Sequence, residues 1–348
     1  MSKVLITGCA GFIGTHLTKR FLNAGHIVYG IDNLSRKGSE INLDWIWALE
    51  SSSSNFHFYQ NDIRNYEKIC TIFKTDDPFD LIIHEAAQVA VTTSVLNPRE
   101  DFEINALGTF NMLEATRIYS LGACFIFAST NKVYGGMKSL EVTEQNSRYE
   151  YKSLPKGVDE IFPLDFHSPY GCSKGAADQY VRDYHRIYNL NTVVLRQSCI
   201  YGTQQYGVED QGWVAWFTIA SILEKQITIY GDGMQIRDIL WIDDLVDLYY
   251  SIFVKRDLVS GEVFNVGGGP ENTLSILELV SLLKNDGILK RPLNYDNWRP
   301  GDQKVFVGSI EKIHSLIGWS PKTNPVEGVK KLIGWVTDNK VLLKKILG

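Results

Sequence analysis

The glycine-rich stretch that begins at Val4 constrains the fold of this chain more than any other part of its sequence. An apolar run ends at Thr7, and glycines follow at intervals of three, at Gly8, Gly11 and Gly14. This pattern predicts a buried strand, a tight turn and a helix whose free backbone N–H groups and dipole favour an anion. Glycine permits the close backbone approach that such a turn needs. We therefore expect the turn to hold the pyrophosphate of a dinucleotide.

A second predicted strand begins at Ile27 and ends on Asp32. A carboxylate at this position can accept hydrogen bonds from both ribose hydroxyls of NAD, and it would repel the 2′-phosphate of NADP. Arg36 leaves NADP open as an alternative, because a nearby arginine can accommodate the 2′-phosphate. The other interpretation of Arg36 is a residue in a solvated loop. We expect the cofactor to be NAD. The residues expected around it in this part of the chain are Gly8, Gly11, Phe12, Ile13, Gly14, Asp32, Asn33, Ser35 and Arg36.

Length and composition narrow the class of protein. A chain of 348 residues is long enough for two domains, or for one large domain with an elaborated second lobe. Its net charge of −5 provides no electrostatic footprint for nucleic acid or an anionic membrane. Five scattered cysteines and seven histidines lack the spacing of metal ligands, so we expect no metal. The cysteines look like reduced, small apolar residues, so we expect a cytoplasmic protein. No apolar run approaches the roughly 18 residues that span a bilayer, so we expect no membrane partner. An apolar strand follows the N-terminus almost at once, so we expect no signal peptide.

Strands and helices alternate through the first half of the sequence. Apolar runs predict further strands over residues 56–59, 80–84 and 124–128, and helical periodicity predicts a helix over 106–120. Within that helix we expect four residues in the core: Leu107, Phe110, Leu113 and Ala115. Strands that alternate with helices favour a parallel sheet covered on both faces. The prediction is therefore an α/β fold, a Rossmann-type doubly wound parallel sheet with a smaller α/β substrate-binding lobe.

Ligands of such sheets bind beyond the carboxyl ends of the strands. Asp62 follows the third predicted strand, where it would either reach an adenine amine or cap a helix. Ala86 follows the next strand and is small enough to let a ligand approach the backbone. Thr130 ends the strand after that. Their shared position at strand ends predicts a single site.

Tyr170 and Lys174 provide the chemistry. They stand four residues apart at the start of a predicted helix, hence on one face of it. The alternative is that this face is an ordinary helix surface with no role in catalysis. A phenol has a pKa of about 10, but an ammonium group and a positive nicotinamide would bring it towards neutral pH. Tyr170 would then remove a hydroxyl proton while Thr130 hydrogen-bonds the same oxygen.

These motifs together resemble the extended short-chain dehydrogenase/reductase family, which acts on nucleotide sugars. The likeness rests on TGCAGFIG, Asp32, HEAA, Asn105, TNKVYG and Tyr170-x-x-x-Lys174, and it continues through GDGMQIRD, FNVGG and RPGD. It implies an NAD-binding domain over 1–200 and 236–270, and a nucleotide-sugar lobe over 201–235 and 271–348. Roles implied by the resemblance are catalysis by Thr130, Tyr170 and Lys174, cofactor contacts from Tyr170, Lys174, Asp62, Ile63, Ala86, Gln88 and Asn105, and substrate contacts from Gln88, Thr130, Gln211, Arg237, Arg299 and Asp302.

Longer runs resemble one branch of that family, the CDP-tyvelose (CDP-paratose) 2-epimerases. These runs are NLSRKG, QVAVTTS, STNKVYG, LDFHSPYGCSKGAADQY and DQGWVAWF. Three positions depart from the wider family pattern. Cys9 replaces a glycine without expected effect, and Cys199 replaces an asparagine that contacts the sugar nucleotide. Glu85 replaces an apolar residue, and we expect it to be a partly solvated residue at the rim of the site.

The resemblance therefore implies a homo-oligomeric, NAD-dependent epimerase that inverts C2 of a CDP-hexose through a transient 2-keto sugar. A CDP-glucose 2-epimerase and a UDP-sugar 4-epimerase remain open. A 4,6-dehydratase is disfavoured, because relatives of that type carry Asp-Glu where this chain has Asn131 and Lys132. A non-catalytic NAD-sensing module is disfavoured too, since a sensor needs no proton-transfer group, and this chain keeps Thr130, Tyr170 and Lys174.

Overall fold

The computed structural model describes residues 1–49, 51–76, 78–299 and 302–347. In the first part of the chain the elements are β1 (Lys3–Thr7), α1 (Phe12–Asn23), β2 (Ile27–Asp32), α2 (Ser39–Trp47), α3 (Ser52–Asn55), β3 (Phe56–Gln60), α4 (Tyr66–Asp76), β4 (Leu81–His84), α5 (Val91–Leu96), α6 (Pro98–Phe102), the π-helical turn η1 (Glu103–Leu107), α7 (Gly108–Tyr119), β5 (Cys124–Thr130), the 3₁₀ turn η2 (Asn131–Tyr134), β6 (Val142–Gln145), β7 (Arg148–Tyr151), α8 (Ser168–Tyr188) and β8 (Asn191–Gln197).

In the second part they are β9 (Cys199–Tyr201), α9 (Trp213–Ile222), β10 (Thr228–Tyr230), β11 (Ile236–Trp241), α10 (Ile242–Val254), α11 (Arg256–Val259), β12 (Val263–Val266), β13 (Thr273–Ser275), α12 (Ile276–Asn285), β14 (Asn294–Asp296), β15 (Val305–Phe306), α13 (Glu311–Ile317), α14 (Pro325–Asp338) and α15 (Lys340–Leu347).

Seven parallel strands form the main sheet in the order β12-β8-β5-β4-β1-β2-β3. The order reverses between β1 and β4, which is where open α/β sheets leave a crevice for ligands. The predicted doubly wound sheet is thus confirmed, and each strand predicted in the first half of the sequence is present.

Side chains of the sheet alternate between two apolar cores. In β5, for example, Phe125 and Phe127 face the core beneath α4, α7 and α8, whereas Cys124 and Ile126 face the core that contains α1 and α10. All seven residues of β5 are buried, as expected for a central strand covered on both faces.

The outward face of α7 differs from its prediction. Leu113 and Ala115 are fully buried, but Leu107 is 40% exposed and Phe110 is 37% exposed. Phe110 lies edge-on to Tyr180 of α8, with 5.7 Å between ring centroids. The helix therefore presents only one side to the sheet, and the prediction that all four residues are in the core was wrong for two of them.

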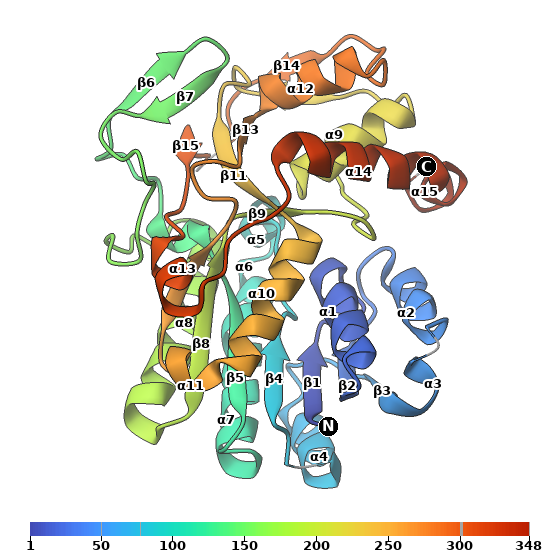
Figure 1. Ribbon diagram of the computed structural model, residues 1–348, viewed down its shortest axis with the longest axis vertical. Helices are drawn as coiled ribbons and strands as arrows, with labels where there is room; N and C mark the ends of the chain where they lie inside the picture. Colours follow the sequence, from blue (N-terminus) through green and yellow to red (C-terminus); the bar gives the residue numbers. More distant parts are fainter. Residues whose placement is uncertain (50, 77, 300–301, 348) are drawn as a thin grey trace.

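A second lobe lies at the carboxyl ends of the main strands, above the sheet in Figure 1. Strand β11 is its centre, and it pairs with β9 and β15 in parallel and with β13 antiparallel. Helices α9, α12 and α14 pack around these strands, and β10 pairs with β14. Two elements lie across the predicted boundaries, because β11 belongs to this lobe's sheet and α13 packs against β12 of the main sheet. The division into two functional domains stays a prediction.

Across the described ranges, no helix combines the length and apolar character needed to cross a bilayer.

Candidate active site

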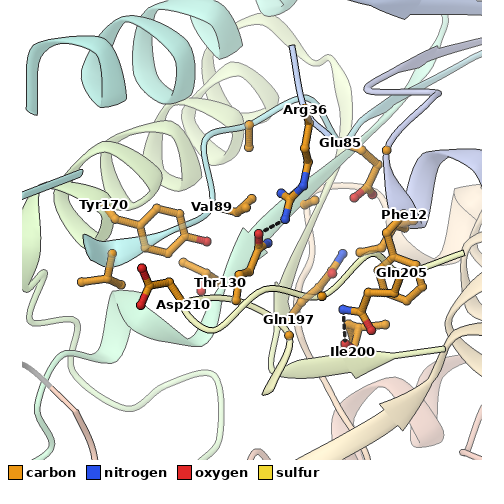
Figure 2. A pocket seen from close by; sticks show the side chains of 18 of the residues that line it. Phe12, Arg36, Glu85, Val89, Thr130, Tyr170, Gln197, Ile200, Gln205 and Asp210 are labelled. Atoms are coloured by element: carbon orange, nitrogen blue, oxygen red, sulfur yellow. Dashed lines mark hydrogen bonds between the residues drawn. The ribbon is translucent and has the colours of Figure 1, made fainter. Parts of the chain in front are cut away.

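A cavity of about 830 Å³ lies where the carboxyl ends of β1 to β5 meet the second lobe. Figure 2 shows Phe12, Thr130, Tyr170 and Gln197 around it, with Asp210 reaching in from the second lobe. Nearly all of the predicted site residues line it: Gly8, Gly11, Phe12, Ile13, Gly14, Asp32, Asn33, Ser35, Arg36, Asp62, Ile63, Ala86, Thr130, Tyr170, Lys174, Gln211, Arg237, Arg299 and Asp302.

The turn after β1 depends on its glycines. Gly8 has φ +70° and donates from its N–H to the carbonyl of Ile31 over 2.7 Å. A Cβ added to Gly14 would lie 2.0 Å from the carbonyl oxygen of Gly8, so no larger residue fits there. Helix α1 begins at Phe12, and no side chain caps its first N–H groups. This cradle suits a pyrophosphate, which would accept hydrogen bonds from those groups.

Asp32 lies at the end of β2 beside this turn. Its Oδ2 accepts from Ala10 N over 3.0 Å, and its Oδ1 accepts from Leu34 N over 2.8 Å. Burial raises the pKa of Asp32, and the two backbone hydrogen bonds oppose that rise. Each oxygen keeps a further lone pair, so the carboxylate is oriented and still able to accept ribose hydroxyls.

Asp62 faces the same part of the cavity. Arg64 donates to both of its oxygens, from Nε over 2.9 Å and from Nη2 over 2.8 Å, and Asn33 donates to Oδ2. The guanidinium of Arg64 holds the pKa of Asp62 at about 2. Helix α4 begins at Tyr66 and is preceded by Asn65, which accepts from a first-turn N–H, so Asp62 is not the helix cap.

Gln88 and Asn105, which were predicted to contact ligands, are not among the residues that line the cavity. Asn105 accepts from Gln88 N over 2.9 Å and donates to Gln88 O over 3.0 Å. The Gln88 amide donates to Ala90 O and to Asp101 Oδ1. Both side chains are consumed in fixing the loop that follows β4, and Ala86 of that loop lines the cavity.

Thr130, Tyr170 and Lys174 meet at one end of the cavity, beyond β5 and at the start of α8. All three are buried, with 6%, 8% and 3% of their surface exposed. The Lys174 ammonium donates to Ala128 O over 2.5 Å and lies 4.3 Å from the centre of the Phe127 ring. The arrangement brings a hydroxyl, a phenol and an ammonium group to the same wall.

Burial dominates the electrostatics of Tyr170. Burial raises its pKa to about 12, and a hydrogen bond with Thr130 only partly opposes this. Burial also lowers the pKa of Lys174 to about 8, although the carboxylates of Glu85, Asp178 and Asp101 favour its charged form. Burial therefore favours the protonated phenol, and the Lys174 ammonium group is directed to a backbone carbonyl.

Two arginines line the cavity from the second-lobe side. Arg237 donates from Nη2 to Asp302 Oδ1 over 2.6 Å. Arg299 pairs with Asp210 over 3.1 Å and lies over the ring of Tyr230, 4.0 Å from its centre. Pro300 and Gly301, the middle of the RPGD motif, lie outside the described residues. Guanidinium groups suit phosphate oxygens because they present paired donors in one plane.

Gln211 joins the two sides of the cavity mouth. Its side-chain oxygen accepts a hydrogen bond from Arg36, which belongs to the loop after β2. The same second-lobe loop is held from the other side by Arg299, which donates to Glu209 O over 3.1 Å. A loop expected to touch substrate is therefore fastened to the part of the cavity expected to hold cofactor.

Glu85 lines the cavity and is partly exposed, as expected, but it is also tied to a distant helix. Its carboxyl group accepts from the hydroxyl of Tyr249, which in turn accepts from Gln197 Nε2 over 2.7 Å. Burial raises the pKa of Glu85 to about 7. The sequence signal was present, since an acid follows directly after a buried strand, but its partner on α10 is 164 residues away.

Comparison with known proteins places this geometry in a family. The family model described as GDP-mannose 4,6 dehydratase matches residues 5–332. The chain is 44% identical over 340 residues to the CDP-paratose 2-epimerase of Salmonella typhi, covering 96% of this chain and 99% of the relative. It is also 30% identical over 344 residues to the dTDP-D-glucose 4,6-dehydratase of Homo sapiens, covering 97% of this chain and 90% of the relative.

A solved structure agrees with these relatives. The chain superposes on the UDP-glucuronic acid 4-epimerase of Bacillus cereus, a complex with UDP-glucuronic acid and NAD, with a TM-score of 0.81 and 28% identity. The match covers 97% of this chain and 99% of that chain. The chain therefore belongs to the GDP-mannose 4,6-dehydratase family of extended short-chain dehydrogenases/reductases.

Proposed function

We propose that this protein is an NAD-dependent nucleotide-sugar epimerase that inverts C2 of a CDP-hexose of the paratose/tyvelose type through a transient 2-keto sugar. The observation that carries the proposal is the 44% identity to a CDP-paratose 2-epimerase over nearly the full length of both chains. The cavity supports it, because it combines a dinucleotide cradle, a proton-transfer group and arginines suited to a diphosphate.

NAD is the cofactor that the cradle fits. The glycine turn and the start of α1 would hold its pyrophosphate, and Asp32 would accept its ribose hydroxyls. When bound, NAD supplies an oxidant that removes hydride from a carbinol carbon and returns it. The adenosine end would lie against Asp62, Ile63, Asn33 and Ser35, whose loops form that side of the cavity.

Tyr170 is the proposed acid/base. Its hydroxyl would take the proton of the sugar hydroxyl and later return it, while Thr130 holds the same oxygen in place. Lys174 lies on the same wall and would favour the ionised tyrosine by its charge. Because burial raises the pKa of Tyr170 to about 12, its ionisation near neutral pH would need further positive charge, which a bound nicotinamide would supply.

Substrate binding would rest on Arg237, Arg299, Asp302 and Gln211. The two arginines would bind the diphosphate, and their carboxylate partners would then turn to the nucleotide ribose. A loosely held hexose at the Tyr170 end would be free to present either face of its ring.

The rival reactions differ in what they need from these residues. Relatives in the family include 4-epimerases and dehydratases. Inversion at C4 would use the same three residues with the sugar docked differently. Dehydration needs an additional acid/base pair next to Thr130, and this chain has Asn131 and Lys132 there. An amide cannot act as a general base, which disfavours dehydration.

We also propose that the protein is a homo-oligomer. Apolar side chains are exposed together along α7 and α8, among them Phe110, Ile118, Tyr180 and Ile187, with between 37% and 64% of their surface accessible. Phe110 and Tyr180 are in contact, so exposed apolar side chains of the two helices meet at this point. A surface of this kind suits association with a second copy.

The deciding experiment is turnover of a substrate panel in D₂O. CDP-paratose, CDP-glucose and UDP-hexoses would be incubated separately, and each product identified by NMR and mass. We expect inversion at C2 of CDP-paratose, with essentially no solvent deuterium at that carbon. Tyr170 can remove a hydroxyl proton, but a phenolate cannot deprotonate an unactivated C–H. Stoichiometric deuterium at C2 would reject this mechanism, and inversion only at C4 of a UDP-hexose would reject the substrate.

A further inference from the structure

Lys132 places an ammonium group in the cavity that the proposed reaction does not yet use. It lies in η2, and its backbone N–H donates to Thr130 Oγ1 over 3.3 Å, so its side chain starts two residues from the proposed catalytic hydroxyl. The residue lines the same cavity as Thr130, Tyr170 and Arg237.

Lys174, Arg237 and Arg299 also line this cavity, and each has a partner. Within the described part of the chain, the Lys132 ammonium group has none. Lys174 donates to Ala128 O, Arg237 to Asp302, and Arg299 to Asp210. Across residues 1–49, 51–76, 78–299 and 302–347, no oxygen accepts a hydrogen bond from the Lys132 side chain, and no carboxylate forms an ion pair with it. An ammonium group has three donors and no acceptor, so its donors are available to a ligand oxygen that enters the cavity.

The charges around Lys132 point to the same conclusion. Burial lowers its pKa to about 8, and the nearby guanidinium of Arg237 lowers it as well. Asp302 opposes this, but that carboxylate is already bound to Arg237. Lys132 is half-buried, so its ammonium group is partly desolvated and accessible from the cavity, and titratable groups perturbed in this way often lie at sites that meet a ligand.

Its position identifies the part of the ligand it would meet. Thr130 and Tyr170 mark the oxygen that loses its proton, and Arg237 marks the diphosphate. Lys132 follows Thr130 by two residues and lines the same cavity as Arg237, so its side chain is within the part of the cavity that both residues border. In a nucleotide sugar, C2 is bonded to the anomeric carbon that carries the β-phosphate, whereas C4 lies across the ring. One cation can therefore touch both the reacting oxygen and the phosphate only when the reacting carbon is next to the anomeric carbon.

We infer that Lys132 donates hydrogen bonds both to the oxygen on the inverting carbon and to the β-phosphate, and that it thereby selects inversion beside the anomeric carbon. This inference rests on the proposed function and deepens it. Lys132 keeps its protons throughout, because the hydroxyl proton goes to Tyr170 and returns from it. Its contribution is a positive charge at the oxygen where negative charge develops, and a tether to the phosphate while the ring turns.

The experiment compares Lys132→Met with Lys138→Met. Methionine keeps the length of the side chain without its donors, and Lys138 is an exposed lysine outside the cavity, so both variants lose one positive charge. For Lys132→Met we expect kcat at C2 to fall roughly 10²- to 10³-fold, as for loss of an oxyanion donor. Affinity for CDP, measured by calorimetry, should fall about 10-fold. Affinity for CMP, which has no β-phosphate, and the NAD content should stay unchanged, and Lys138→Met should match the parent protein.

The two arms separate this inference from the function on which it rests. If the parent protein turns over no CDP-hexose, the proposed function fails, but the CDP and CMP arm still tests Lys132. Equal affinity of Lys132→Met and the parent for CDP would overturn the inference, as would a kcat at C2 within threefold of the parent. If Lys132→Met does not fold, Lys132→Gln takes its place, since it keeps a neutral donor. Its kcat at C2 and its affinity for CDP should then lie below those of the parent, but the loss should be smaller than that expected for Lys132→Met.

Discussion

Arg237 and Asp302 come from segments 65 residues apart and are joined by a 2.6 Å hydrogen bond in the wall of the cavity. Only 10% of the arginine side chain and 22% of the aspartate side chain are exposed. The guanidinium is thus held in one orientation before any ligand binds, with part of its donor edge still available to the cavity. Preorganised donors of this kind bind phosphate without a further loss of side-chain freedom.

Replacing this arginine should weaken substrate binding more than it slows chemistry. A hydrogen bond to a charged group contributes about 1.5–3 kcal/mol, so for Arg237→Gln we expect KM to rise roughly 10- to 100-fold. Arg148→Gln is the control, because it also breaks a partly buried ion pair, with Glu278, but lies outside the cavity. Steady-state kinetics and CDP calorimetry would measure both variants. Equal effects in both would mean that Arg237 only stabilises the fold.

Tyr170→Phe should abolish turnover and leave the fold intact, because only one hydroxyl is removed. Loss of a general acid/base typically lowers kcat about 10²- to 10⁴-fold. Tyr184→Phe is a matched control on the same helix, since its hydroxyl donates to Glu114 away from the cavity. Circular dichroism and released-nucleotide content should be the same in all three proteins. Activity of Tyr170→Phe near that of the parent would show that another group moves the proton.

Gly14→Ala should abolish cofactor binding, since the new Cβ would lie 2.0 Å from the Gly8 carbonyl oxygen. Gly122→Ala meets no atom within 4 Å and is the control. Mass spectrometry of nucleotide released by denaturation should find NAD in the parent and in Gly122→Ala, and none in Gly14→Ala. A parent protein loaded mainly with NADP would contradict the role of Asp32.

Asp238 should make the protein less stable as pH rises. Its side chain is fully buried, and burial raises its pKa to about 7. Between about pH 4 and pH 7 the folded protein keeps a proton that the unfolded chain releases, so the free energy of unfolding falls as pH increases. At about 1.4 kcal/mol per pKa unit, the whole effect is about 4 kcal/mol at most.

The matched variant is Asp238→Asn, which cannot titrate and keeps an oxygen to accept from Ser198. Urea unfolding at pH 5, 6, 7 and 8 should show a steeper loss of stability in the parent than in the variant. Glu85 also has a raised pKa, and its contribution is the same in both proteins. Parallel pH profiles would rule out a titrating Asp238.

A charge on the exposed face of α7 should separate the proposed subunits. Phe110→Asp introduces a carboxylate into the surface shared with Tyr180, so we expect a smaller particle in size-exclusion chromatography with light scattering. Ile161→Asp alters another exposed apolar residue, 89% accessible, and should leave the mass unchanged. An unchanged mass for Phe110→Asp would place any interface elsewhere.

Local sequence patterns were enough to predict the sheet and the cofactor side of the cavity. Apolar runs, glycine spacing and strand-end polar residues act over fewer than ten neighbouring positions, and topology then gathers the ends of parallel strands at one edge. This is why Gly8, Asp32, Asp62 and Thr130, which lie on four different strands or turns, all line one cavity.

Side-chain partners from distant segments could not be predicted in the same way. Glu85 is held in place because the Tyr249 hydroxyl of α10 donates to it, and the Gln88 side chain is engaged because its amide donates to Asp101 and to Ala90 O. Phe110 fits the helical period of a core residue, yet α7 turns it outwards. In each case tertiary packing, which periodicity does not encode, decides the environment.

The strand order of the main sheet also limits how this protein can be made. Strand β8 is complete at Gln197, but its outer neighbour β12 begins only at Val263. During synthesis, a chain that has just left the ribosome through β8 carries an open sheet edge until β9, α9, β11 and α10 have all emerged. Unpaired edges invite association between chains, so the interval before Val263 is when a nascent chain is most prone to aggregate and most in need of a chaperone.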